Sequence, residues 1–165
     1  MGLDIHLVVE ASEFDDFHQS SGIVFAEPPR NTKLFFAMAG IRGEPCRFPA
    51  RGFPDTASSI AVFHFGRAAV DNLDEVDSWG TACISRKWAL ESANLGTSRP
   101  LKWGLVSSPE FISPSWLRLS ELREVVEVAS VQHTELSLEL AVIMELMASI
   151  EARGLRSRIV FWFSE

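Results

Sequence analysis

The sequence has little cysteine, no tyrosine and no long apolar run. Its 165 residues include only two cysteines, Cys46 and Cys83. Two cysteines are too few for a disulfide framework or a zinc-binding cysteine cluster, and we interpret both as small apolar residues. No apolar stretch approaches the roughly 18 to 20 residues that cross a bilayer, and Asp4 and His6 interrupt any N-terminal signal segment. We therefore expect a cytoplasmic protein that binds no membrane.

Lysine is also scarce, although the chain is rich in arginine. Three lysines and twelve arginines stand against 22 acidic residues, which gives a net charge of −7. This acidic balance disfavours long nucleic acid, because affinity for it depends on neutralising phosphates. Arginine nevertheless offers planar pairs of donors that suit phosphate, carboxylate or the edge of a base. The composition is therefore compatible with a small anionic or aromatic ligand in a locally positive pocket.

The two ends of the chain alternate apolar and polar residues with the period of a strand. Residues 3–10 read LDIHLVVE and residues 158–163 read RIVFWF. If both strands turn their apolar sides to one core, Asp4 and His6 share the opposite face with Arg158 and Trp162. A salt bridge from Asp4 to Arg158 is one interpretation of that face, and a ligand site is the other.

Between these strands, periodicity and capping residues predict several helices. Asn31 is a suitable N-cap for residues 32–39, and Gly40 suits the end of that helix. Ser120 is the expected cap of a helix that reaches Ala129. Residues 134–153 form the clearest helix, with an apolar stripe that we assign to the core: Leu136, Leu140, Ile143, Met147 and Ile150.

The remaining segments are harder to assign. Residues 22–26 suit a short strand, and residues 41–55, with three prolines, suit an ordered loop. Residues 56–65 fit a helix capped by Asp55 slightly better than a strand. A helix at 83–94 and a strand or turn at 100–106 are weaker expectations.

The expected architecture is a single α+β domain of residues 1–165. At 47% hydrophobic residues, a chain of this length buries roughly two-thirds of its unfolded surface in one core. We expect a small β-sheet that includes both terminal strands, with the two C-terminal helices packed on one face. The apolar stretch 142–150 also suits a homodimer interface.

Five short motifs, in order along the chain, resemble an uncharacterised family of bacteriophage and prophage proteins. Its members typically begin Met-Gly-Cys-Asp-Ile-His, enter a helix with Arg-Asn-Tyr, and carry an Arg-Gly-Leu-Pro loop and a His-Ser-x-Ser-Trp-Leu turn. They finish near Val-Phe-Trp-Phe. The counterparts here are MGLDIH at 1–6, RNT at 30–32, RGFPD at 51–55, ISPSWL at 112–117 and VFWF at 160–163.

This resemblance implies a small phage-encoded α+β protein in the bacterial host cytoplasm. Phage proteins of this size often counter host defence, and some bind or degrade nucleotide-derived immune signals, so the analogy suggests such a ligand. The chain departs from the family pattern at Leu3, Thr32 and Ile112, where cysteine, tyrosine and histidine are usual. Any catalytic or metal-binding role of that histidine is therefore lost here.

Asp4 and His6 form the first candidate site. They stand two residues apart on one face of the first strand, roughly 7 Å apart along it, so both reach a common point above the sheet. A metal would need a third ligand, and His18, His64 and His133 show no metal-binding spacing relative to them. We therefore expect neither a metal nor another cofactor.

Arginine residues supply the second group of candidates. Arg30 and Asn31 stand at a helix N-terminus, where free N–H groups and the helix dipole favour a carboxylate or phosphate. Plain capping by Asn31 is the alternative. Arg51 and Asp55 bracket a stiff Gly-Phe-Pro turn, where Arg51 either contacts a ligand or makes a salt bridge to Asp55.

Ser113, Ser115 and Trp116 complete the candidate ligand-binding residues. They offer two hydroxyls and an indole that either stacks on a base or plugs the core ahead of a helix. The sequence contains no Gly-x-Ser-x-Gly elbow, phosphate loop or dinucleotide fingerprint, so it gives no support for a serine nucleophile.

We therefore expect a protein that sequesters a small anionic, nucleotide-derived molecule without turning it over. The enzyme alternative uses His6 as general acid and base, oriented by Asp4, to cleave a phosphodiester or glycosidic bond. A second alternative is a protein-binding inhibitor that blocks a host factor through its acidic surface.

Overall fold

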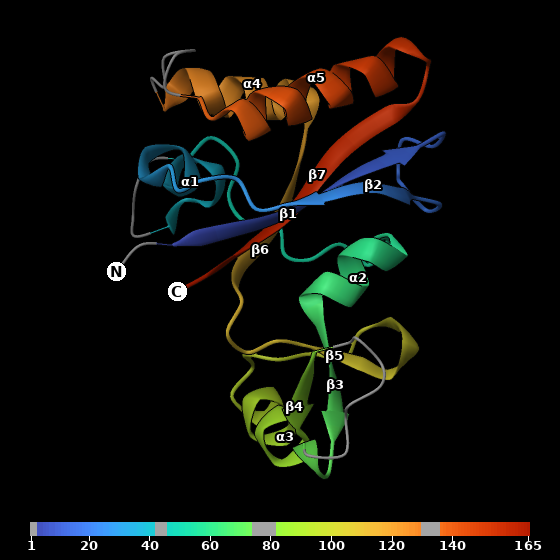
Figure 1. The fold of residues 1–165 in the computed structure, drawn as a ribbon, viewed down its shortest axis with the longest axis vertical. Helices are drawn as coiled ribbons and strands as arrows, with labels where there is room; N and C mark the ends of the chain where they lie inside the picture. The colour runs from blue at the N-terminus through green and yellow to red at the C-terminus, as the bar shows by residue number, and fades with distance from the viewer. Residues whose placement is uncertain (1–2, 42–45, 74–81, 130–135) are drawn as a thin grey trace.

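The computed structural model describes residues 3–41, 46–73, 82–129 and 136–165. In these residues five α-helices and seven strands form an α+β fold with two sheets. The larger sheet has the strand order β2-β1-β7-β6 and the smaller one the order β4-β3-β5. Figure 1 shows the smaller sheet at the opposite end of the molecule from helices α4 and α5. The α+β class expected from the sequence is therefore confirmed.

The two terminal strands lie side by side at the centre of the larger sheet. Strand β1 (Asp4–Ser12) runs antiparallel to β7 (Arg156–Ser164), with Asp4 opposite Ser164 and Glu10 opposite Arg158. Strand β2 (Ser21–Ala26) pairs with the other side of β1. The predicted strands at both ends and at 22–26 are thus confirmed.

Strand β6 (Ile112–Arg118) forms the outer edge of this sheet beside β7. The turn predicted for these residues ahead of a helix is therefore wrong. The strand is irregular at these residues. Its pairing with β7 shifts register between Ile112 and Ser115, and Ser113 is left-handed with a φ of 48°. Pro114 cannot donate a ladder hydrogen bond, but an edge strand tolerates it.

Helix α1 (Thr32–Ala39) matches its prediction at both ends. The Asn31 side chain accepts a hydrogen bond from the Leu34 N–H, and Gly40 adopts the left-handed conformation that ends the helix. Helix α4 (Leu119–Val128) begins two residues earlier than predicted, with Arg118 rather than Ser120 as its cap. The Glu121 carboxylate accepts the Arg118 N–H and supplies the cap interaction.

Helix α5 (Leu138–Ala152) is capped by Ser137, whose hydroxyl accepts the Leu140 N–H. The predicted start at Thr134 lies outside the described residues. Four members of the predicted stripe are buried: Leu140, Ile143, Met147 and Ile150. The opposite side of α5 leaves Leu138 and Val142 exposed. A role for this side in dimer formation stays a prediction.

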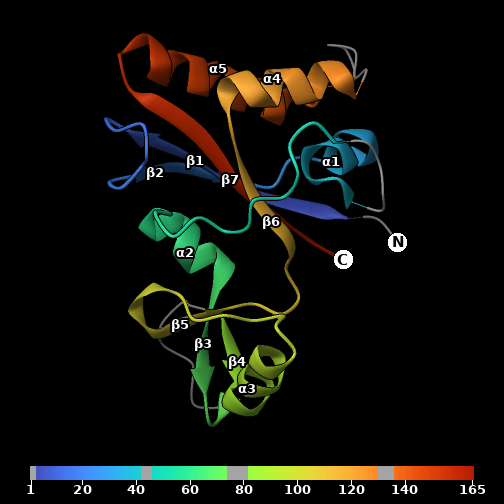
Figure 2. The same ribbon diagram turned by 180° about the vertical axis from the view of Figure 1, so that it is seen from behind.

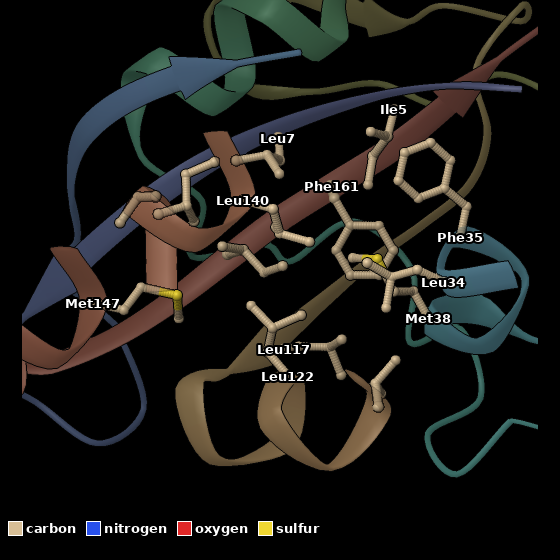
Figure 3. Packing of buried hydrophobic residues seen from close by; sticks show 14 of the residues in the cluster. Ile5, Leu7, Leu34, Phe35, Met38, Leu117, Leu122, Leu140, Met147 and Phe161 are labelled. Atoms are coloured by element: carbon tan, nitrogen blue, oxygen red, sulfur yellow. The ribbon is translucent and has the colours of Figure 1, made fainter. Parts of the chain in front are cut away.

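Helices α1, α4 and α5 cover one face of the larger sheet. Figure 3 shows Phe161 from the sheet packed among Leu34 and Met38 of α1 and Leu122 of α4. Ile5 and Leu7 point to the same core from β1, and both are almost fully buried. The alternation of β1 and β7 therefore places their odd-numbered apolar residues against these helices, as the sequence predicts.

Helix α2 (Ser59–Phe65) lies on the opposite face of the sheet, as Figures 1 and 2 show. Its cap is Ser58 rather than the expected Asp55, because the Ser58 hydroxyl accepts the Ala61 N–H. A second apolar cluster forms here, with Trp162 at its centre and these neighbours: Val8, Phe53, Ala57, Ala61, Val62, Phe65, Leu105 and Val160. Much of this second face of the sheet, for which the sequence suggested a salt bridge or a ligand site, therefore belongs to the hydrophobic core.

A buried salt bridge crosses this second face. The Arg158 Nε donates to Glu10 Oε2 at 2.7 Å, and the two side chains are 3% and 0% exposed. Burial lowers the pKa of Arg158, although the negative charge of Glu10 opposes this shift. The predicted pair of Asp4 and Arg158 is wrong, because the antiparallel register places Arg158 opposite Glu10 instead.

The smaller sheet contains β3 (Gly66–Val70), β4 (Cys83–Ser85) and β5 (Leu105–Ser107), with helix α3 (Arg86–Asn94) after β4. The helix expected at 83–94 therefore begins late, because its first three residues are a strand and Ser85 is its cap. A short 3₁₀ turn, η3 (Lys102–Gly104), precedes β5, so residues 100–106 are partly turn and partly strand. Within the described residues, no helix combines the length and apolar character needed to cross a bilayer.

Candidate active site

His6 lies between a hydroxyl and a carboxylate at one end of the larger sheet. Its Nε2 is 2.8 Å from Ser164 Oγ, and its Nδ1 is 2.7 Å from Glu27 Oε1. Ser164 stands opposite Asp4 in the ladder, so it is the diagonal neighbour of His6 on the same face. Glu27 directly follows β2, which pairs with the other side of β1. Three strands therefore bring these three side chains together.

The hydrogen-bond partners define the proton positions on this imidazole. An ionised carboxylate only accepts hydrogen bonds, so the Nδ1 next to Glu27 carries a proton. In the neutral ring Nε2 is then an acceptor, and the Ser164 O–H donates to it. A nucleophilic hydroxyl needs this arrangement to lose its proton to an adjacent base that a third group orients.

Aromatic rings hold the imidazole in place. The Trp162 ring lies 6.0 Å from it at an interplanar angle of 17°, and the Phe111 ring lies at 5.4 Å. Phe25 of β2 is a further neighbour at 6.4 Å. The His6 side chain keeps only 17% of its surface exposed. Its orientation towards Ser164 is therefore set before any ligand binds.

Asp4 makes a different contact from the one expected. Its two carboxylate oxygens accept hydrogen bonds from Arg30 Nε at 2.6 Å and Nη2 at 2.8 Å. These bonds lower the pKa of Asp4 from its usual value, so the carboxylate is charged at neutral pH. The Arg30 guanidinium, which was predicted to hold an anion, is thus bound to Asp4. Glu27 rather than Asp4 orients His6.

Arg51 belongs to a second group at the β6 edge. Its guanidinium makes a paired contact with Glu121, with distances of 2.9 and 2.6 Å, and lies 4.3 Å from the centre of the Trp116 ring. Its backbone N–H donates to Ser115 Oγ at 3.0 Å. The salt bridge from Arg51 to Asp55, one of the two alternatives for this loop, is wrong, because Arg51 pairs with Glu121. Asp55 instead lies 3.7 Å from Arg99, in a third location.

These groups lie apart on the sheet. Trp116 pairs with Val160, four residues along β7 from Ser164, which is roughly 13 Å at the rise of a strand. Asp4, His6, Arg30 and Asn31 come together at one end, whereas Arg51, Ser115 and Trp116 come together near the middle of β6. These contacts therefore do not bring all the candidate ligand-binding residues together at one site.

Replacing Glu121 with glutamine tests the ion pair at the β6 edge. Burial raises the pKa of Glu121, but hydrogen bonds from Arg51 and the Arg118 N–H outweigh it and lower the pKa below 4.5. Around that pH the unfolded chain binds more protons than the folded one, so the contribution is present at pH 7 and lost as the pH falls. We expect Glu121→Gln to lower the free energy of unfolding by about 1 kcal/mol at pH 7.

Urea denaturation at pH 7 and pH 3.5 measures this effect. The difference between wild type and Glu121→Gln should shrink at the lower pH, because Glu121 of the unfolded wild type takes up a proton below its usual pKa, whereas the glutamine does not titrate. Glu139→Gln on the exposed side of α5 is the matched control and should change little. An equal difference at both pH values would contradict the electrostatic contribution.

Sequence reasoning missed Ser164 and Glu27, the two residues that complete the His6 site. Neither stands in a recognised motif, because one is near the C-terminus and the other follows a weakly patterned strand. The available signal was the alternation of β1 and β7. Once Ile5 is placed opposite Phe163, Ser164 becomes the diagonal neighbour of His6.

Within the described residues, no three histidine, cysteine or acidic side chains cluster as metal ligands would. The His6 group instead combines a hydroxyl, an imidazole and a carboxylate, which suits proton transfer at Ser164. No protein-family model, curated protein or solved structure matches this chain.

Proposed function

We propose that the protein is a serine-dependent hydrolase with Ser164 as nucleophile, His6 as general base and Glu27 as the orienting carboxylate. One observation carries this proposal: Ser164 Oγ and Glu27 Oε1 lie within 2.8 Å of opposite nitrogens of the same ring. This arrangement of roles recurs on unrelated folds and is recognised by geometry rather than by sequence order.

The reaction follows from these contacts. Ser164 Oγ attacks the acyl carbon while its proton passes to His6 Nε2, and the Glu27 carboxylate stabilises the resulting imidazolium. His6 then gives that proton to the leaving group, and an acyl ester of Ser164 remains. Water attacks this ester, His6 takes a proton from the water, and Ser164 recovers its hydroxyl as the acid leaves.

The charges around the site favour an uncharged substrate. Glu27 and Asp4 bring two carboxylates close to His6, and the Arg30 guanidinium is already bound by Asp4. This excess of negative charge opposes the approach of a phosphodiester. We therefore propose a carboxylic ester or amide in place of the phosphodiester or glycosidic bond considered from the sequence.

Covalent labelling tests the proposal without knowledge of the natural substrate. An alkyl fluorophosphonate should form a stable ester with Ser164 as fluoride leaves, and mass spectrometry of peptides locates the label. Ser164→Ala should abolish labelling. Ser149→Ala, which removes an exposed hydroxyl on α5, should leave it unchanged. Labelling that survives in Ser164→Ala would contradict the proposed nucleophile.

Capture of an anion without turnover remains a second proposal, but the arginines named by the sequence suit it less well. Arg30 and Arg51 each hold a carboxylate in a paired contact. An incoming phosphate would have to displace Asp4 or Glu121 from them. A cation that contacts backbone carbonyl oxygens instead of a carboxylate can bind a phosphate without first losing a carboxylate partner.

A further inference from the structure

A second cavity lies between the segment before α2 and the turn before β5. A cavity of about 210 Å³ separates these two segments, and its lining is as follows: Phe53, Pro54, Asp55, Val62, Arg99, Pro100, Leu101 and Lys102. Two of these residues are cations, and Asp55 is the one acid among them. The pocket is distinct from the His6 site in its lining and in its charge.

Both cations contact backbone carbonyl groups across the cavity. Arg99 Nη2 donates to the Phe53 carbonyl, and Lys102 Nζ donates to the Ala57 carbonyl at 3.4 Å. The carboxylate of Asp55 is 94% exposed and lies 3.7 Å from Arg99, which is a weak contact. The positive charge here is therefore less neutralised than at Arg30 or Arg51, and an anion can approach it.

Next to Lys102, two aromatic rings stand in solvent. Trp103 and Phe63 are 58% and 48% exposed, and their rings are nearly parallel with centroids 5.2 Å apart. Such exposure is unusual for rings of this size, because burial of their apolar surface would be favourable. The Phe63 ring covers one face of the indole.

The backbone holds Trp103 in a conformation that a bulky side chain rarely adopts. Its φ of 57° and ψ of 29° are left-handed, which costs on the order of 1 kcal/mol or more for a residue with a Cβ. Two backbone hydrogen bonds close the turn. The Leu101 N–H donates to the Leu105 carbonyl at 2.8 Å, and the Ser107 N–H donates to the Arg99 carbonyl at 2.9 Å. These bonds therefore hold the strained turn, in which Trp103 directly follows Lys102 and keeps its ring exposed.

From this juxtaposition we infer that the surface formed by Arg99, Lys102, Trp103 and Phe63 binds an aromatic anion of the nucleotide type. The phosphate enters the cavity between the two cations, and the base stacks on the aromatic pair. Neither aromatic ring lines the cavity of about 210 Å³, so the cavity takes the phosphate. The base is left outside, where Trp103 lies.

Isothermal titration with adenosine monophosphate tests this site. Trp103→Asn removes the ring but keeps a residue that tolerates the left-handed backbone, and we expect it to weaken binding about 5- to 100-fold. Lys102→Glu should weaken binding at least as much. The matched controls are Trp88→Ala and Lys87→Glu on α3, which alter the same residue types away from the cavity and should bind as wild type does.

Further ligands separate the two parts of the site. Adenosine and inorganic phosphate alone should each bind more weakly than the nucleotide, and added salt should weaken nucleotide binding. Absence of nucleotide binding at millimolar concentration, or wild-type binding by Trp103→Asn with native circular dichroism, would overturn the inference. Ser164→Ala should keep full affinity for the nucleotide, so this result is independent of the proposed hydrolase.

Discussion

Replacing Arg158 with methionine is expected to lower the free energy of unfolding by about 3 to 5 kcal/mol. The substitution keeps a long side chain but leaves the Glu10 carboxylate buried without its cation. Glu10 is fully buried, and its second oxygen accepts the Ser58 N–H at 2.6 Å. A charge in this position cannot recover its lost hydration from solvent. Urea denaturation at pH 7 measures the loss.

The double variant Glu10→Gln/Arg158→Met separates the unpaired charge from the loss of contacts. It removes both charges and leaves a glutamine oxygen to accept the Ser58 N–H, so it should be more stable than Arg158→Met alone. It should still be less stable than wild type, because Arg158 also donates to the Thr56 carbonyl and hydroxyl oxygens at 3.1 and 3.2 Å. A double variant no more stable than the single one would contradict this account.

This pair also shows why sequence alone described only one side of the sheet. The alternation of β1 places Ile5 and Leu7 on one face, and that face was assigned correctly to the core. Arg158 was expected on the other face, either in a salt bridge to Asp4 or at a ligand site, and no partner was predicted for Glu10. Their register makes them mutual partners, and that pairing lets both be buried under the segment before α2. Burial of a charge depends on its partner, which strand periodicity does not specify.

Helix boundaries were predictable where a cap acts within a few residues. Asn31 and Gly40 bound α1 as expected, because both interactions are local. At α4 the cap depends on the Glu121 carboxylate reaching back to the Arg118 N–H, and Ser120 was the more obvious candidate. Residues in β6 were missed because their ladder partners in β7 lie forty or more residues away in the chain. Local signals do not report such pairing.

The candidate site was predictable to a similar extent. Asp4 and His6 were identified from their spacing on one strand, and the structure places them at the same end of the sheet. Their partners come from two other segments: Glu27 and Arg30 after β2, and Ser164 at the end of β7. Three of these contacts pair groups more than twenty residues apart, so no short motif contains them. Residue types suggested the chemistry, but the register decided which groups meet.

The hydrolase proposal predicts the largest effects on activity. With an ester substrate such as p-nitrophenyl butyrate, Ser164→Ala and His6→Gln should each lower kcat by about 10³-fold or more, because each removes a group that acts in every step. Glu27→Gln should cost less, about 10- to 100-fold, since Glu27 is 58% exposed and its negative charge is partly screened by water. Initial rates at saturating substrate measure these differences.

The pattern across combined variants distinguishes catalysis from a purely structural hydrogen-bond network. If Ser164 and His6 act as one unit, the double variant Ser164→Ala/His6→Gln should be no slower than either single variant. Asp4→Asn should retain most activity, because Asp4 binds Arg30 and Glu27 orients the imidazole. If the network only joins the strands, the same variants should lower the free energy of unfolding and leave the kcat of the folded protein unchanged. Wild-type kcat in folded Ser164→Ala would therefore end the assignment of Ser164 as nucleophile.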